Sequence, residues 1–445
     1  MAEISDKLFD RRQFLAAMGL MTAGVCVGCR SSRVSENPAS VDKPNIIVIL
    51  SDDQGYADAS CYEHAKEVST PNIDSLAKDG VRLTDGYVSC ASCAPSRAGL
   101  LTGRYQQRFG FYDNPYAEHG VFRDQTTIAQ LLKDAGYATA IVGKWHLGSQ
   151  PENHPNSKGF DEFYGFLGGG HDYFNLEMKR NPIYRNDEII VHGEKGYLTD
   201  VLSREAAEFV DRHSSRAPFF LYLAYNAVHK PEQAPEKYLR MFNTADERRD
   251  SYLARLASLD EGIGVVLAAL KRNGVYDNTL VFFLSDNGGT GAGADMGILR
   301  GGKGSFYEGG IRVPFIVSWP RQLPAGKVCS EPIISLDVLP TAVAVAGGEL
   351  PKDRIIDGHN MIPALLGKID GPLHKAFFWT YADPATWAVR RGKWKLVCID
   401  DRLKLYDLES DIAEKMDLAK QDPDLVRELK EAYVAWNKGL KQEKD

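Results

Sequence analysis

The chain has 445 residues, of which 44% are hydrophobic, enough for one large α/β unit with an appended subdomain. Its 53 Lys and Arg residues are outnumbered by 60 Asp and Glu residues, and the formal net charge is -7. This balance excludes a broad basic face for nucleic acid or anionic lipid, so an anionic substrate must be met by a local cluster of cations.

The first thirty residues have the layout of an export signal. Arg11 and Arg12 precede an apolar run over residues 15–27, as in twin-arginine signals, and this run is shorter than the ~20 residues that cross a bilayer. We predict a signal over residues 1–30, with Cys29 as a candidate lipoprotein cysteine, and a polar linker over 31–43. The protein is then exported by a bacterium to the periplasm or outer surface and touches a membrane only if Cys29 is lipidated.

Four buried strands are predicted in the following region, and polar side chains follow each of them. The apolar runs cover residues 44–50, 138–143, 218–225 and 279–285. Helices are expected between them, over residues 71–78, 126–135, 199–213 and 246–272. This alternation predicts an α/β fold with a doubly wound, mostly parallel sheet flanked by helices. The polar residues at the strand ends are Asp52, Asp53, Lys144, His146, His229, Asp286 and Asn287.

A further helix is predicted to start at Cys93 and to stop at Gly103. The free N–H groups of its first turn and Arg97, one turn along, favour negative charge beside residue 93. Cys90 and Cys93 also have the spacing of a thiol redox motif, but the surrounding sequence lacks a thioredoxin-like context. The five cysteines beyond the signal are too scattered for a disulfide framework.

The pattern changes after residue 349. Alternating apolar and polar residues over 377–381, 387–399 and 403–408 predict antiparallel strands, and a helix is expected over 423–438. We therefore place the catalytic α/β domain at residues 44–349 and a smaller C-terminal α+β subdomain with an antiparallel sheet at 350–445.

The strand ends suggest a metal site with oxygen ligands. Asp52, Asp53, Asp286 and Asn287 offer only oxygen donors, which favour Ca²⁺ or Mg²⁺ over Zn²⁺. Taken separately, the pair Asp52 and Asp53 is equally typical of a helix cap, and the pair Asp286 and Asn287 is equally typical of a turn. We expect both pairs to lie at one edge of the sheet, and this favours a metal site.

Cations are expected around the same edge, and they suit a tetrahedral anion such as phosphate or sulfate. Each also has an ordinary structural explanation as a solvated charge or a hydrogen-bonded histidine. The glycine-rich run leading to Lys303 fits the spacing of a nucleotide-binding loop, but Gly304 stands where that motif requires Ser or Thr. The cations are Arg97, Lys144, His146, His229 and Lys303.

Four segments together resemble one family, the type I, formylglycine-dependent sulfatases of the alkaline phosphatase superfamily. They are residues 93–103 (CAPSRAGLLTG), 143–148 (GKWHLG), 286–288 (DNG) and 301–303 (GGK). The resemblance runs from about residue 44 into the C-terminal subdomain. It implies a sulfuric ester hydrolase in which a separate maturation enzyme oxidises Cys93 to formylglycine.

The resemblance also implies the roles of the site residues. One calcium ion would be held by Asp52, Asp53, Asp286, Asn287 and the modified Cys93. Arg97 and Lys144 would hold the hydrated aldehyde and the sulfate, and Lys303 and His229 would contact the sulfate and its leaving oxygen, with His229 as general acid. His146 would take the proton of the second hydroxyl, so that collapse to the aldehyde releases sulfate after the first hydroxyl has attacked sulfur.

Two other functions remain open from the sequence. A phosphomonoesterase, phosphodiesterase or phosphonate hydrolase of the same superfamily is one, although Asn287 is a poor zinc ligand. A non-catalytic protein that binds sulfated glycans, with Cys93 unmodified, is the other. Export and the aromatic outer loops suggest a sulfated saccharide as substrate, with His171 and Trp387 as candidate sugar contacts. Twin-arginine export of the folded chain would allow maturation of Cys93 in the cytoplasm.

Overall fold

The computed structural model describes residues 43–62, 67–119, 122–190, 195–291, 293–383 and 385–441. The predicted export signal with Cys29, and all of the predicted linker except Lys43, lie outside the described residues. None of the described helices has the length and apolar character needed to cross a membrane.

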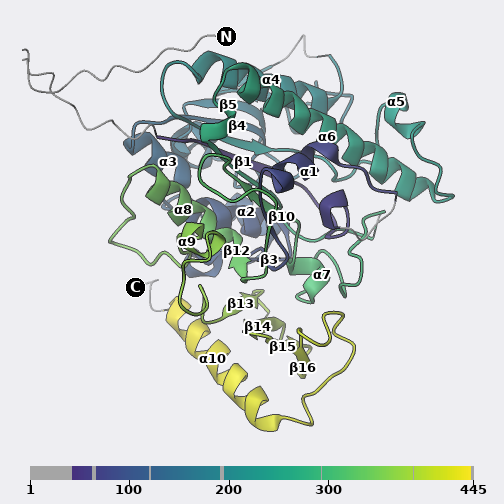
Figure 1. The fold of residues 1–445 in the computed structure, drawn as a ribbon, viewed down its shortest axis with the longest axis vertical. Helices are drawn as coiled ribbons and strands as arrows, with labels where there is room; N and C mark the ends of the chain where they lie inside the picture. Colours follow the sequence, from purple (N-terminus) through teal and green to yellow (C-terminus); the bar gives the residue numbers. More distant parts are fainter. Residues whose placement is uncertain are drawn as a thin grey trace, which may run out of the picture. The chain divides into compact units, whose positions relative to one another are not determined.

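A ten-stranded sheet organises the larger part of the chain (Figure 1). Its central strands β9, β1, β8, β4 and β5 are parallel neighbours, and β10 pairs antiparallel with β9. The strand order is β11 (Lys327–Cys329), β2 (Gly80–Leu83), β10 (Phe315–Ser318), β9 (Thr279–Ser285), β1 (Asn45–Ser51), β8 (Phe219–Ala224), β4 (Ala138–Lys144), β5 (Glu162–Phe166), β6 (Tyr184–Arg185) and β7 (Glu188–Ile189).

Helices cover both faces of this sheet because its central strands are apolar on both sides. Ile47 and Ile49 of β1 belong to one buried cluster, and Ile46 and Val48 belong to another on the opposite face. The first cluster lies under α1 (Pro71–Lys78), α4 (Leu198–His213) and α6 (Glu247–Arg272), and the second under α2 (Cys93–Thr102), α3 (Ile128–Asp134) and α8 (Val338–Val345) (Figure 1). The predicted α/β fold with a doubly wound, mostly parallel sheet is thus confirmed.

The C-terminal part forms a separate antiparallel sheet. Its strands are β13 (Phe377–Thr380), β14 (Trp387–Arg391), β15 (Trp394–Ile399) and β16 (Arg402–Asp407), in that order, and α10 (Pro423–Lys441) packs against them. The predicted antiparallel sheet is confirmed, with a turn at Gly392 that divides the stretch 387–399 into two strands. Residues 43–445 form one compact unit, in which no division falls at residue 349 or 350. The predicted boundary between the two parts therefore stays a prediction.

Short elements were not anticipated from the sequence. Strands β2, β5, β6, β7 and β11 extend the main sheet on both sides, and β3 (Gly86–Tyr87) pairs with β12 (Ile333–Ile334). The short helices α5 (Glu236–Leu239), α7 (Glu308–Ile311) and α9 (Ile362–Leu365) complete the fold. A run of two to five residues is too short to show a hydrophobic periodicity, so the sequence does not reveal it. The short strands are recognised only by their hydrogen bonds to strands that are distant in the sequence.

Candidate active site

The predicted site residues meet at the carboxyl edge of the central parallel strands. Asp52 and Asp53 follow β1, Lys144 ends β4, and Asp286 follows β9. Helix α2 begins at the same edge, and Cys93 is its first residue. Polar groups separated by up to about 230 residues in the chain therefore form one buried cluster, as expected for ligand sites of open α/β sheets.

Three carboxylates and three cations interlock in this cluster. The guanidinium of Arg97 lies 2.8 Å from Asp286 Oδ2 and 3.3 Å from Asp52 Oδ2. Lys144 Nζ lies 2.5 Å from Asp52 Oδ2, and Lys303 Nζ lies 2.5 Å from Asp53 Oδ1. The formal charges of these six side chains sum to zero, so a bound divalent cation would make the cluster positive and attractive to an anion.

The charges set the protonation of the carboxylates. Burial opposes ionisation of Asp52, but the surrounding cations, Lys144 foremost, hold its pKa well below the usual range. Burial and the neighbouring charge of Asp52 raise the pKa of Asp286. Burial opposes the charge of Arg97, but the groups around it, Asp286 foremost, together raise its pKa. Asp52 is therefore an anion at neutral pH, with Arg97 as a permanent cation beside it.

Cys93 is buried in this cluster as a thiol of low reactivity. Its Sγ accepts a hydrogen bond from Lys303 Nζ at 3.0 Å. Burial raises the pKa of Cys93 to about 11, against the lowering effect of Lys144. The sequence predicted that the helix start and Arg97 favour negative charge here, but Arg97 is engaged by two carboxylates. An unmodified Cys93 is thus protonated at neutral pH and a poor nucleophile.

The two histidines of the site differ in their surroundings. Burial, and then the charges of Lys144 and Arg97, lower the pKa of His146 well below its ordinary value. Its Nδ1 is buried, and no described residue forms a hydrogen bond with it. His229 Nε2 lies 3.7 Å from Asp53 Oδ2, and its Nδ1 lies 2.7 Å from the carbonyl oxygen of Lys230. His146 is therefore neutral and free to accept a proton, whereas the backbone contact orients His229.

The oxygen donors fit a metal ion. One ligand atom each from Asp52, Asp53 and Cys93 lie within 4.8 Å of one another. Asp52 Oδ1 and Asn287 Oδ1 are buried and have no hydrogen-bond partner among the described residues, although Asn287 Nδ2 donates to Asp53 Oδ1 at 2.8 Å. Buried oxygen atoms without partners are costly, and a hard cation such as Ca²⁺ would satisfy them.

His171 lies near this cluster with its ring buried. Only 2% of the residue is exposed, and the ring packs against Phe166 with 5.2 Å between centroids. Its Nδ1 contacts the carbonyl oxygen of Asp172 at 2.7 Å. Its role as a substrate contact stays a prediction. Trp387 stacks on Tyr433 at 4.1 Å and packs in the C-terminal sheet.

A glycine strip, Gly168–Gly170, lies beside the two histidines and also lines a neighbouring cavity. Asn181 holds this strip: its Oδ1 accepts from Gly168 N at 3.0 Å, and its Nδ2 donates to Gly170 O at 2.8 Å. The sequence drew attention to the three glycines, but Asn181 was missed because it belongs to no motif and only the tertiary structure brings it back to the strip.

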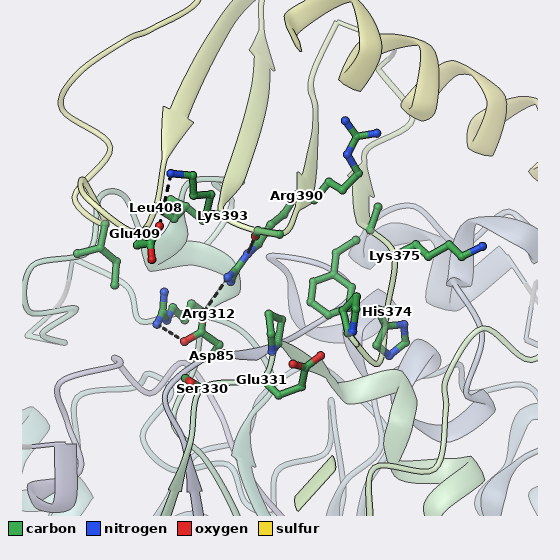
Figure 2. Close-up of a pocket in the computed structure, with 17 residues that line it drawn as sticks. Asp85, Arg312, Ser330, Glu331, His374, Lys375, Arg390, Lys393, Leu408 and Glu409 are labelled. Atoms are coloured by element: carbon green, nitrogen blue, oxygen red, sulfur yellow. Dashed lines mark hydrogen bonds and ion pairs between the residues drawn. The ribbon is translucent and has the colours of Figure 1, made fainter. Parts of the chain in front are cut away.

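A cavity of about 720 Å³ lies elsewhere, between β13–β16 and the loops after β2 and β11 (Figure 2). None of the predicted site residues lines it. Asp85 forms ion pairs there with both Arg312 and Arg390, and Lys393 pairs with Asp407. These charges are matched within the protein, whereas the predicted site residues lie in the cluster around Cys93.

Comparison with known proteins identifies relatives along nearly the whole described chain. The family model "Sulfatase" matches residues 44–348, and the model "N-sulphoglucosamine sulphohydrolase, C-terminal" matches residues 302–438. Arylsulfatase J of Mus musculus is 35% identical over 395 residues, which cover 82% of this chain and 64% of that protein. This chain thus spans less than two thirds of the length of that relative.

Two further proteins are similar. N-acetylgalactosamine-6-sulfatase of Homo sapiens is 35% identical over 384 residues, which cover 76% of this chain and 72% of that protein. The crystal structure of Ps i-CgsB in complex with k-i-k-neocarrahexaose has a TM-score of 0.85 and 40% identity, and covers 89% of this chain and 93% of the other.

Proposed function

Because the chain belongs to the sulfatase family of the alkaline phosphatase superfamily, we propose that it hydrolyses the sulfate ester of a sulfated saccharide. The observation that carries this proposal is the burial of Cys93 among three carboxylates and three cations at the sheet edge. Similarity to an N-acetylgalactosamine-6-sulfatase and to a structure with bound neocarrahexaose supports a saccharide as the alcohol.

We propose one calcium ion as the metal. The partnerless oxygens of Asp52 and Asn287, and the grouping of Asp52 and Asp53 with Cys93, support a hard cation at this place. Asp286 would complete the ligand set. When bound, calcium supplies positive charge that polarises the sulfate and lowers the pKa of a coordinated hydroxyl group.

We propose that Cys93 is converted to formylglycine by a separate maturation enzyme. The protonated, buried thiol of Cys93 supports this proposal, because it is itself unsuited to attack sulfur at neutral pH. The hydrated aldehyde supplies a hydroxyl nucleophile and a second hydroxyl that allows sulfate to leave without attack by water.

The other residues bind the anion and move protons. Arg97, Lys144 and Lys303 supply three positive charges around the oxygens of the sulfate. His229 lies at the rim of the cluster, 13% exposed, where it can donate a proton to the leaving sugar oxygen. The lowered pKa of His146 suits it to accept a proton from the group at residue 93.

Two measurements test the proposal. Mass spectrometry of the peptide that contains Cys93, from protein made in the native host, should show the aldehyde in place of the thiol. The same protein should hydrolyse an aryl sulfate, lose this activity with a calcium chelator, and regain it when calcium is added. An unmodified thiol would contradict the formylglycine, and faster hydrolysis of aryl phosphate than of aryl sulfate would instead assign the protein to the phosphoesterases.

A further inference from the structure

A second cavity, of about 590 Å³, adjoins the candidate active site. The glycine strip Gly168–Gly170 forms part of its wall, together with Glu118, Ser149, Arg180 and Asn181. These residues come from the loop after β4, the loop after β5 and the short helix at residues 114–119. The cavity therefore draws on three distant parts of the chain.

The glycine strip places this cavity next to the catalytic histidines. A Cβ atom on Gly169 would lie 2.6 Å from His146 Nε2, and a Cβ atom on Gly170 would lie 3.3 Å from the ring of His229. Only glycine allows the first approach without displacement of the histidine. The strip thus contacts both histidines and also lines the cavity, so the cavity begins beside the residue proposed to protonate the leaving sugar oxygen.

The polar groups around the cavity suit a charged sugar. Arg180 is exposed, and within the described part of the chain no carboxylate pairs with it. Glu118 accepts a hydrogen bond from Ser149 Oγ at 2.7 Å through Oε2. A guanidinium recognises sulfate or carboxylate groups by two parallel hydrogen bonds, and a carboxylate accepts hydrogen bonds from sugar hydroxyls.

We propose that this cavity binds the saccharide beyond the scissile sulfate, and that Arg180 selects substrates with a second anionic group, either a further sulfate or a uronic carboxylate. This inference rests on the proposed sulfatase activity. The glycine strip, which has no side chains, lines the cavity on the side of the two histidines. Arg180 thus determines specificity and does not take part in the cleavage.

Kinetics of Arg180→Gln test the inference. Three substrates are compared: a monosulfated disaccharide, its counterpart with one more sulfate, and its counterpart with a uronic carboxylate; 4-nitrophenyl sulfate serves as the small reference. We expect Arg180→Gln to lower kcat/KM for the doubly charged saccharides by roughly 10- to 100-fold, because a charge-assisted hydrogen bond is lost. The same variant should change the hydrolysis of 4-nitrophenyl sulfate by less than about twofold, because this substrate has no second anionic group. Lys179→Gln is the matched control, because Lys179 is an exposed neighbouring cation that does not line the cavity.

The outcomes separate this inference from the proposed function. A preference for the doubly sulfated or the uronic substrate that disappears in Arg180→Gln supports the inference and identifies the anionic group. Equal losses on all substrates, an equal loss in Lys179→Gln, or no preference in the unaltered enzyme would overturn it while sulfate is still released. If the unaltered enzyme releases sulfate from none of the substrates, the proposed function fails and this inference fails with it.

Discussion

Two residues of the site, Asp53 and His146, have left-handed backbone conformations, with φ of 60° and 61°. Side chains other than glycine adopt this region at a cost of about 1 kcal/mol or more, and such strain concentrates at functional sites. It turns both side chains toward the cluster immediately after β1 and β4 end. Local strain thus fixes where a carboxylate and a proton acceptor lie.

Replacement of His146 by asparagine separates backbone geometry from proton transfer. Asparagine tolerates the left-handed conformation, so we expect His146→Asn to fold with a nearly unchanged Tm. Loss of the proton acceptor should lower the rate of aryl sulfate hydrolysis by roughly 100- to 10,000-fold. Steady-state kinetics and thermal melts measure both effects. His213→Asn, a histidine outside the cluster, is the control, and activity close to normal in His146→Asn would remove this residue from the proposed roles.

At the scale of elements, a buried ion cluster joins the C-terminal sheet to the glycine-rich segment that carries Lys303. Lys395 Nζ of β15 lies 2.7 Å from Glu308 of α7 and 2.9 Å from Glu414, and the side chains of all three are fully buried. Tyr87 donates a further hydrogen bond to Glu308. The C-terminal strands thereby help to hold the loop from which Lys303 reaches Cys93.

Removal of the central cation should destabilise the fold. In Lys395→Met, Glu308 and Glu414 lose their shared partner while they remain buried, and we expect the free energy of unfolding to fall by about 3–5 kcal/mol. Denaturation in urea measures the change. Lys393→Met is the matched control in the same hairpin, because Lys393 is 43% exposed and its solvent-screened ion pair should contribute little to stability. Equal effects of both variants would contradict the role assigned to Lys395.

At the scale of the whole molecule, the site connects strands on both sides of β1. Its carboxylates follow β1 and β9, and its cations come from α2, β4 and the segment before α7. A metal ion bound by these carboxylates therefore cross-links elements that are up to about 230 residues apart in the sequence. Because the metal ion would bind the folded chain and not the unfolded chain, its binding would stabilise the folded state of the whole unit.

Removal of calcium should accordingly lower the thermal stability. With free calcium at 100 times its Kd, the expected stabilisation is about 2.7 kcal/mol, so a chelator should lower the Tm by several degrees. Differential scanning calorimetry with EDTA, and again after an excess of calcium, measures the shift. An Asp286→Asn variant should show a smaller calcium-dependent shift. The same Tm with EDTA and with calcium would contradict a bound ion.

Local sequence patterns predict the long buried strands β1, β4, β8 and β9 and the main helices, and they indicate the kinds of side chain that the site contains. Continuous apolar runs with polar ends identify buried parallel strands such as residues 279–285. A strand that is buried on both faces must be apolar along its whole length, so consecutive residues are enough to recognise it. The segment from Cys93 to Gly103 likewise carries its helix start and stop in adjacent residues, and the structure has the helix there.

The tertiary structure alone decided which groups meet and how they titrate. Lys303 reaches Cys93 across 210 residues, and Asn181 holds the glycine strip, through contacts that no local pattern encodes. The raised pKa of Cys93 follows from its burial and from the neighbouring charges of Asp286, Asp52 and Asp53, which the strand order brings together. Local sequence determines which elements form, whereas electrostatics and cavities depend on distances between elements, and these exist only in the folded chain.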